Sequence, residues 1–190
     1  MSEQIHDPIH DRGQQLENLF FKQQDAKLLE RIRQESENKE QREQLQHASG
    51  ISDQAALDGL VAVGVTADSL TSVSLIPLVA VAWADRRMEY AEKVAVLKAA
   101  ETVGLEKDSS GYQVLEGWLA NKPSQELLDA WKGYVAAVKE KLDSSAFSQM
   151  QSSIMGRAEE VAKAAGGFLG MGNRVSESEQ KVLDELAAAF

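Results

Sequence analysis

The most apolar stretch of the chain is Ser74-Leu75-Ile76-Pro77-Leu78-Val79-Ala80-Val81-Ala82-Trp83-Ala84. It stops at Asp85-Arg86-Arg87, well short of the ~20 apolar residues that a bilayer-spanning helix requires. Apolar residues occupy all of its faces, which predicts a helix that is buried on most sides within a soluble domain. Pro77 lacks a backbone N–H and is expected to kink this helix, which we place over residues 66–84.

The regions on either side of this stretch also favour helices. The sequence has only three prolines, and its β-branched residues stand singly among Ala, Leu, Glu and Lys, without period-2 alternation. Turn residues divide the chain into a long N-terminal helix and about seven further helices. The predicted fold class is therefore all-α, a multi-helix bundle. The long helix is predicted to begin near Pro8 or Asp11 and to end at Gln46. The other predicted helices cover residues 52–63 (capped by Ser52), 89–103, 109–120, 123–142, 145–165 and 176–189.

Composition excludes several kinds of chemistry. The 190 residues include no cysteine, 20 Lys and Arg, and 30 Asp and Glu, for a formal net charge of −10. Without cysteine there is no disulfide framework and no thiolate ligand or nucleophile. The acidic balance argues against nucleic-acid binding, which needs clustered Lys and Arg. The polar start of the chain lacks the features of a signal peptide, so we expect a cytoplasmic protein with no membrane span.

The predicted organisation is a helical arm over residues 1–48 followed by an all-α domain over residues 49–190. Acidic and basic residues are equal in number between Lys22 and His47, which is typical of a solvated helix. The first half of the arm also carries an apolar stripe, which predicts contact with a protein partner or self-association. The sequence leaves open whether the arm projects or folds back. The stripe consists of Leu16, Leu19, Phe20, Phe21, Leu28, Leu29 and Ile32.

Two segments of the predicted domain share a pattern. One runs from Ala84 to Glu92 and the other from Gly172 to Glu179. In each, a polar turn is followed by one apolar residue, a capping position, and a glutamate three residues later. This spacing is typical of a capping box, in which a side chain and the backbone exchange hydrogen bonds at a helix start. It is clearest in Ser176-Glu177-Ser178-Glu179.

The first segment resembles the TerB-like (tellurite-resistance) family, in which an apolar helix ends in Ala-Asp-Gly-x-hydrophobic-x-x-x-Glu. The resemblance implies an all-α fold in which acidic residues at such turns bind a divalent cation. Asp85 and Glu92 match the motif, and Glu89 is a further candidate ligand. Arg86 stands where the family has Gly, and we expect it to disfavour a turn with positive φ.

The second segment supplies Glu177 and Glu179 as weaker candidate ligands. Gly172 or Asn173 occupies the place of its acidic partner.

The start of the arm is similar to the zeta-type inhibitor subunit of rotary ATP synthases. The similarity rests on Asp11-Arg12, Glu17 and Phe20-Phe21, with Lys27 and Arg31 following on the same polar helix. It implies a helix that inserts into a partner assembly. A regulator of a larger assembly, such as a rotary ATPase, is therefore one alternative function.

Enzymatic motifs are absent from the sequence. It contains no Gly-x-Ser-x-Gly elbow and no phosphate-binding loop, and its three histidines all lie outside the predicted domain. We therefore predict a non-catalytic helical interaction or stress-response module, for which the TerB-like resemblance implies divalent cation binding at an acidic turn. The remaining alternative is a small metal-assisted enzyme that uses a carboxylate pair such as Glu89 and Glu92.

Overall fold

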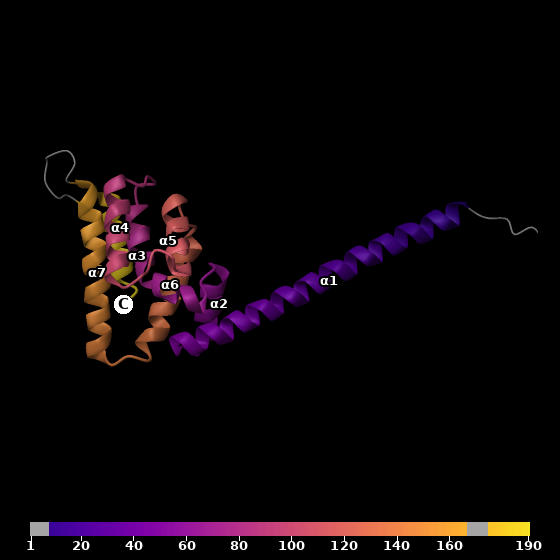
Figure 1. Ribbon diagram of the computed structural model, residues 1–190, viewed down its shortest axis with the longest axis horizontal. Coiled ribbons are helices and arrows are strands. Elements are labelled where there is room, and N and C mark those ends of the chain that lie inside the picture. The colour runs from indigo at the N-terminus through magenta and orange to yellow at the C-terminus, as the bar shows by residue number, and fades with distance from the viewer. Residues whose placement is uncertain (1–7, 167–174) are drawn as a thin grey trace, which may run out of the picture. The chain divides into compact units, whose positions relative to one another are not determined.

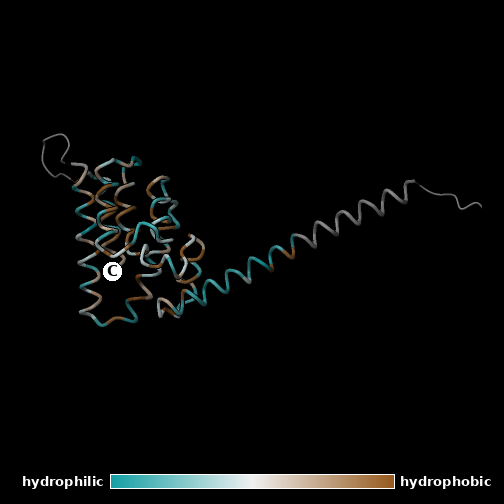
Figure 2. The backbone as a smooth tube through the Cα atoms, viewed as in Figure 1, coloured by the Kyte–Doolittle hydropathy of each residue, from teal (hydrophilic) through white to brown (hydrophobic). Residues whose placement is uncertain are grey.

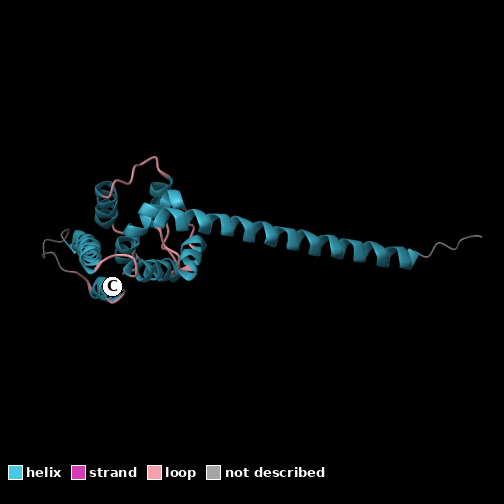
Figure 3. Ribbon diagram, turned by 90° about the horizontal axis from the view of Figure 1, so that it is seen from below, coloured by secondary structure: helices cyan, strands magenta, loops and turns pink. Residues whose placement is uncertain are grey.

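The computed structural model describes the backbone of residues 8–166 and 175–190, and the side chains of residues 27–164 and 175–190. Every regular element in these ranges is helical, which confirms the predicted all-α fold class (Figure 3). In chain order the elements are α1 (Pro8–Ser49), α2 (Gln54–Ala62), η1 (Ala67–Leu75), α3 (Ile76–Ala82), α4 (Tyr90–Thr102), α5 (Ser110–Ala120), α6 (Gln125–Lys139), α7 (Ser144–Gly166) and α8 (Glu177–Ala187).

The chain divides into two compact units, Met1–Glu40 and Gln41–Phe190. The division falls within α1, eight residues before the end of the predicted arm at residue 48. The last turns of α1 belong to the second unit, because Leu45 is fully buried in its core. In addition, Arg42 Nη1 lies 2.7 Å from Asp58 Oδ1 on α2.

The first unit consists of the preceding part of α1. From residue 27 onward its residues are mostly hydrophilic, apart from a short apolar segment (Figure 2). This agrees with the balanced charges in the sequence.

The second unit is built around α3, which contacts α4, α6, α7, α8 and η1 (Figure 1). Six of its seven residues are buried, so the most apolar stretch of the sequence does form the centre of the core. The buried residues of α3 are Ile76, Pro77, Leu78, Val79, Val81 and Ala82.

The prediction of one kinked helix over residues 66–84 is wrong. The segment forms the 3₁₀ helix η1, which begins after Thr66, and the separate α-helix α3. Pro77 lies in the first turn of α3, where the backbone N–H that proline lacks has no intrahelical partner in any case. Pro77 therefore stands at the start of a helix and kinks none.

Aromatic side chains close the core on the side of α6 and α7. Trp131 is fully buried and packs edge-on against Phe190, with ring centroids 5.4 Å apart. Phe147, from α7, meets Phe190 in the same way at 5.8 Å. Near the end of α3, the indole N–H of Trp83 donates to the backbone carbonyl of Trp118 at 2.9 Å and links this end of the core to α5.

The start of α2 differs from the prediction by one residue. Asp53, and not Ser52, is the N-cap, and its Oδ1 accepts a hydrogen bond from Ala56 N at 2.7 Å. Both residue types are good caps, so their order along the chain did not distinguish them.

Among the described residues, no single helix has both the length and the apolarity to cross a membrane. Only α2 taken together with the segment Ala67–Ala82 meets those limits, as a pair bent by 88°.

Candidate functional site

The turn between α3 and α4 has a left-handed residue where the family pattern has glycine. Arg86 adopts φ = 70°, and its backbone N–H donates to the carbonyl of Trp83 at 3.0 Å. The chain therefore makes the turn with positive φ although the residue is an arginine, at the steric cost that a side chain has in this conformation. Asp85 Oδ1 accepts a hydrogen bond from Arg87 N at 2.8 Å, so one oxygen of the exposed Asp85 carboxylate is bound to the backbone of the same turn.

The start of α4 buries a carboxylate. Glu89 is the N-cap, and its backbone N–H donates to Glu92 Oε2 at 2.8 Å. Glu92 is only 3% exposed, whereas Glu89 is exposed. Met88, just before the cap, packs against the core and fixes how the chain enters the helix. The capping box predicted at this position is confirmed.

The start of α8 repeats this arrangement. Ser176 N donates to Glu179 Oε2 at 2.6 Å, and Glu179 N donates to Ser176 Oγ at 3.2 Å. Glu179 is 6% exposed, and Val175 packs against the core as Met88 does. This capping box is confirmed too.

The fold brings the two buried glutamates together. Glu92 and Glu179 are the only charged residues buried among those that the structure describes. The pKa of Glu92 is raised from 4.5 to about 7, chiefly because burial disfavours the charged form, and the hydrogen bond from Glu89 N opposes this rise. Repulsion from Glu179, Asp85 and Glu89 makes up the rest of the rise. The sequence pattern identified each capping box but not their proximity.

The remaining candidate ligands lie at the edge of this pair. Asp85, Glu89 and Glu177 are exposed, and Gly172 and Asn173 lie outside the described residues. Across the described part of the chain, no three His, Asp or Glu side chains are grouped so that they could hold a metal ion together. The described residues therefore offer no closed cage of protein ligands for a metal ion.

The apolar stripe of the arm is described from residue 27 onward. Leu28, Leu29 and Ile32 are 56%, 67% and 54% exposed. Leu16, Leu19, Phe20 and Phe21 lie in α1, but their side chains are outside the described residues. In the described part of α1, the stripe is thus an exposed cluster of three large apolar side chains.

A groove that the sequence analysis missed runs between α2 and α6. Its volume is about 570 Å³. The two helices approach closely because Gly59 faces Ala130 and Gly133 faces Ala56, at distances that leave room for little more than a methyl group. Small residues recur every three or four positions on both helices, and this spacing was the available signal. They are Ala55, Ala56, Gly59 and Ala62 on α2, and Ala130, Gly133, Ala136 and Ala137 on α6.

Comparison with protein families, with curated proteins and with solved structures gives no match for this chain. The resemblances to the TerB-like family and to the zeta-type inhibitor therefore stay predictions.

Proposed function

We propose that this protein is a non-catalytic helical interaction module whose N-terminal helix binds a protein partner. The observation that carries the proposal is the exposed apolar cluster of Leu28, Leu29 and Ile32 on α1. Single exposed leucines are ordinary on protein surfaces, but three at helical spacing form a continuous apolar face. Recognition of a helix by a protein groove uses anchors with this spacing.

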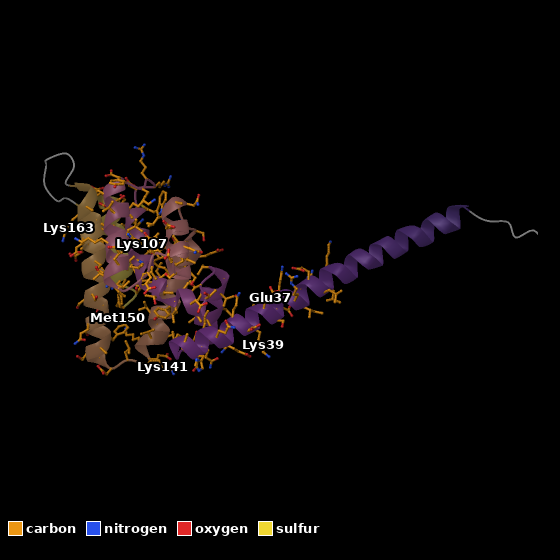
Figure 4. All side chains as sticks on the ribbon, in the orientation of Figure 1. Glu37, Lys39, Lys107, Lys141, Met150 and Lys163 are labelled. Carbon is orange, nitrogen blue, oxygen red and sulfur yellow. The ribbon has the colours of Figure 1, made fainter. Side chains whose placement is uncertain are left out.

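The electrostatics of the arm support the same function. Around the cluster, Arg33 Nε and Glu37 Oε1 form an exposed ion pair at 3.1 Å, and Figure 4 shows Glu37 and Lys39 extending from α1. Exposed pairs of this kind stabilise a helix by only a few tenths of a kcal/mol. Breaking such a pair to form contacts with a partner therefore costs little free energy.

The experiment replaces all three apolar residues in the full-length chain, as Leu28→Gln, Leu29→Gln and Ile32→Gln. Glutamine is a good helix former, so circular dichroism should show an unchanged helix content. Association, measured by sedimentation velocity over a concentration series, should be lost. A double variant of the exposed Glu35 and Asn38 to glutamine is the matched control and should behave as wild type. Association that survives the triple substitution would refute the proposed function.

A second proposed function is divalent cation binding at Glu92 and Glu179. It is supported by the raised pKa of Glu92, because a cation near these carboxylates would relieve both their desolvation and their mutual repulsion. Mg²⁺ commonly binds in this way, through one or two carboxylates and several waters. The groups that would hold it are the carboxylate oxygens left over once each Oε2 accepts its capping hydrogen bond.

Isothermal titration at pH 8 with Mg²⁺, Ca²⁺ and Mn²⁺ tests this second function. Binding should weaken at least about tenfold in Glu92→Gln, which removes a ligand charge and keeps a capping acceptor. Substitution of the exposed Glu116 to Gln is the control. Absence of binding below millimolar concentration, or equal affinity in Glu92→Gln, would exclude cation binding.

A further inference from the structure

The groove between α2 and α6 has a chemical character that points to one kind of occupant. Its floor consists of small apolar residues, so a bound helix could approach the two backbones closely. Its volume of about 570 Å³ falls within the range of roughly 300–1,000 Å³ that is typical of ligand-binding clefts. Four carboxylates line it, and no Lys or Arg is among the described residues that do so. These acidic residues are Asp53, Glu126, Asp129 and Glu140.

The positions of these carboxylates set the polarity of the groove. Asp53 and Glu126 lie at the starts of α2 and α6, and Glu140 lies just after the end of α6. Asp129 stands between them on α6, 3.9 Å from Lys132 Nζ. A negative rim around an apolar floor favours a ligand with an apolar face flanked by positive charges.

The chain itself contains a segment with this character. Residues 27–33 read Lys-Leu-Leu-Glu-Arg-Ile-Arg, with three basic residues and one acidic residue. Leu28, Leu29 and Ile32 form the exposed apolar face of this segment. Arg31 and Arg33 adjoin Ile32 in the sequence and therefore project to opposite sides of it on the helix.

We propose that the α2–α6 groove of one copy of this protein binds residues 27–33 of a second copy. The apolar cluster of the arm would cover the Ala and Gly floor, and Lys27, Arg31 and Arg33 would face the acidic rim. This inference rests on the proposed function, because it assigns a partner surface to the same helix face. The charges on the two sides are opposite, so the contact also predicts association that weakens as salt is added.

Charge reversal tests the contact in the full-length chain. The groove variant carries Glu126→Lys and Glu140→Lys, and the arm variant carries Lys27→Glu and Arg31→Glu. All four positions are exposed, so both variants should stay folded, as circular dichroism and thermal unfolding will show. A control with Glu106→Lys and Glu116→Lys makes the same change in net charge as the groove variant, at exposed sites outside the groove.

Sedimentation equilibrium at low ionic strength is the measurement. The wild type should have a mass above that of one chain, and each reversal should weaken association at least about tenfold. Combining the two reversals should restore it, and the control should match the wild type. A monomeric wild type, a groove variant that associates like the wild type, or a combined variant that stays as weak as the single reversals would each overturn the proposal.

Further outcomes separate this inference from the function on which it rests. If the Leu28, Leu29 and Ile32 triple variant loses association while the groove variant keeps it, the arm binds elsewhere. The proposed function then stands and the groove assignment falls. Crosslinks between residue 29 and the groove within a single chain, at the mass of a monomer, would also overturn the assignment to a second copy.

Discussion

The buried carboxylate of Glu92 makes stability depend on pH in an unusual direction. Its pKa is raised to about 7 in the folded protein from an ordinary value of 4.5. Between these two values the folded state holds a proton that the unfolded state has released. Stability from this group is therefore fully present below pH 4.5, falls as the pH rises, and is lost above pH 7.

The size of the effect follows from the same two pKa values. A rise from 4.5 to about 7 corresponds to about 3 kcal/mol at most. Part of the rise comes from Asp85 and Glu89, whose exposed charges are screened by water and salt. We therefore expect a loss of about 1–3 kcal/mol between pH 4.5 and pH 8.

The Glu92→Gln variant separates the pH-dependent contribution of Glu92 to the free energy of unfolding from that of the other ionisable groups. The amide oxygen of glutamine can still accept the hydrogen bond from Glu89 N, but it carries no charge. Urea unfolding of both proteins at several pH values should give nearly equal stabilities at pH 4.5–5. At pH 8 the variant should be more stable by about 1–3 kcal/mol.

The control for this experiment is Glu116→Gln, at an exposed position of α5, for which the difference from wild type should not change with pH. If the wild-type and Glu92→Gln stabilities stay parallel from pH 5 to pH 8, Glu92 does not carry a raised pKa. The reasoning about the buried pair would then be wrong.

Three further predictions follow from single positions and are tested by urea unfolding. Arg86→Gly should increase stability by up to about 1 kcal/mol, because glycine adopts φ = 70° without strain, whereas Arg86→Ala should not. Ser176→Ala should cost about 0.5–2 kcal/mol, since Glu179 N loses its hydrogen-bond acceptor at the start of α8. Leu45→Ala should cost about 2–5 kcal/mol, because this fully buried side chain holds the last turns of α1 in the core. Losses well below these values for Ser176→Ala or Leu45→Ala, or equal effects of glycine and alanine at position 86, would contradict the corresponding arguments.

Local sequence patterns predicted the helices and their caps well. The all-α class followed from residue types and turn residues, and the capping boxes followed from a glutamate placed three residues after a capping position. Pro77 shows the limit of such reasoning. The proline and the apolar residues around it were compatible with one kinked helix. In the structure, the 3₁₀ helix η1 ends and the α-helix α3 begins just before this proline.

The candidate site was less predictable, for a different reason. The sequence identified Glu92 and Glu179 one at a time, but α4 and α8 each pack against α3 and α7, and the resulting repulsion between these carboxylates is a tertiary property. The same holds for the α2–α6 groove, because a series of small residues shows close packing only once the facing helix is known. Arg86 adds a third case, because this residue adopts φ = 70° against the ordinary preference of a non-glycine residue.

The paired capping boxes also bear on the order in which the protein assembles. Each box is satisfied by residues within its own helix start, so α4 and α8 can each begin without the other. The repulsion between Glu92 and Glu179, which is one part of the electrostatic cost, arises only when the two helix starts are brought together, so this part acts on the docking of α8 rather than on helix formation. As the pH rises, α8 should therefore detach as a partial unfolding unit before the rest of the core opens. Between pH 5 and pH 8 the exchange of the α8 amide protons would then speed up by more than the rise in their intrinsic exchange rates accounts for, while the amide protons of α3 would stay protected.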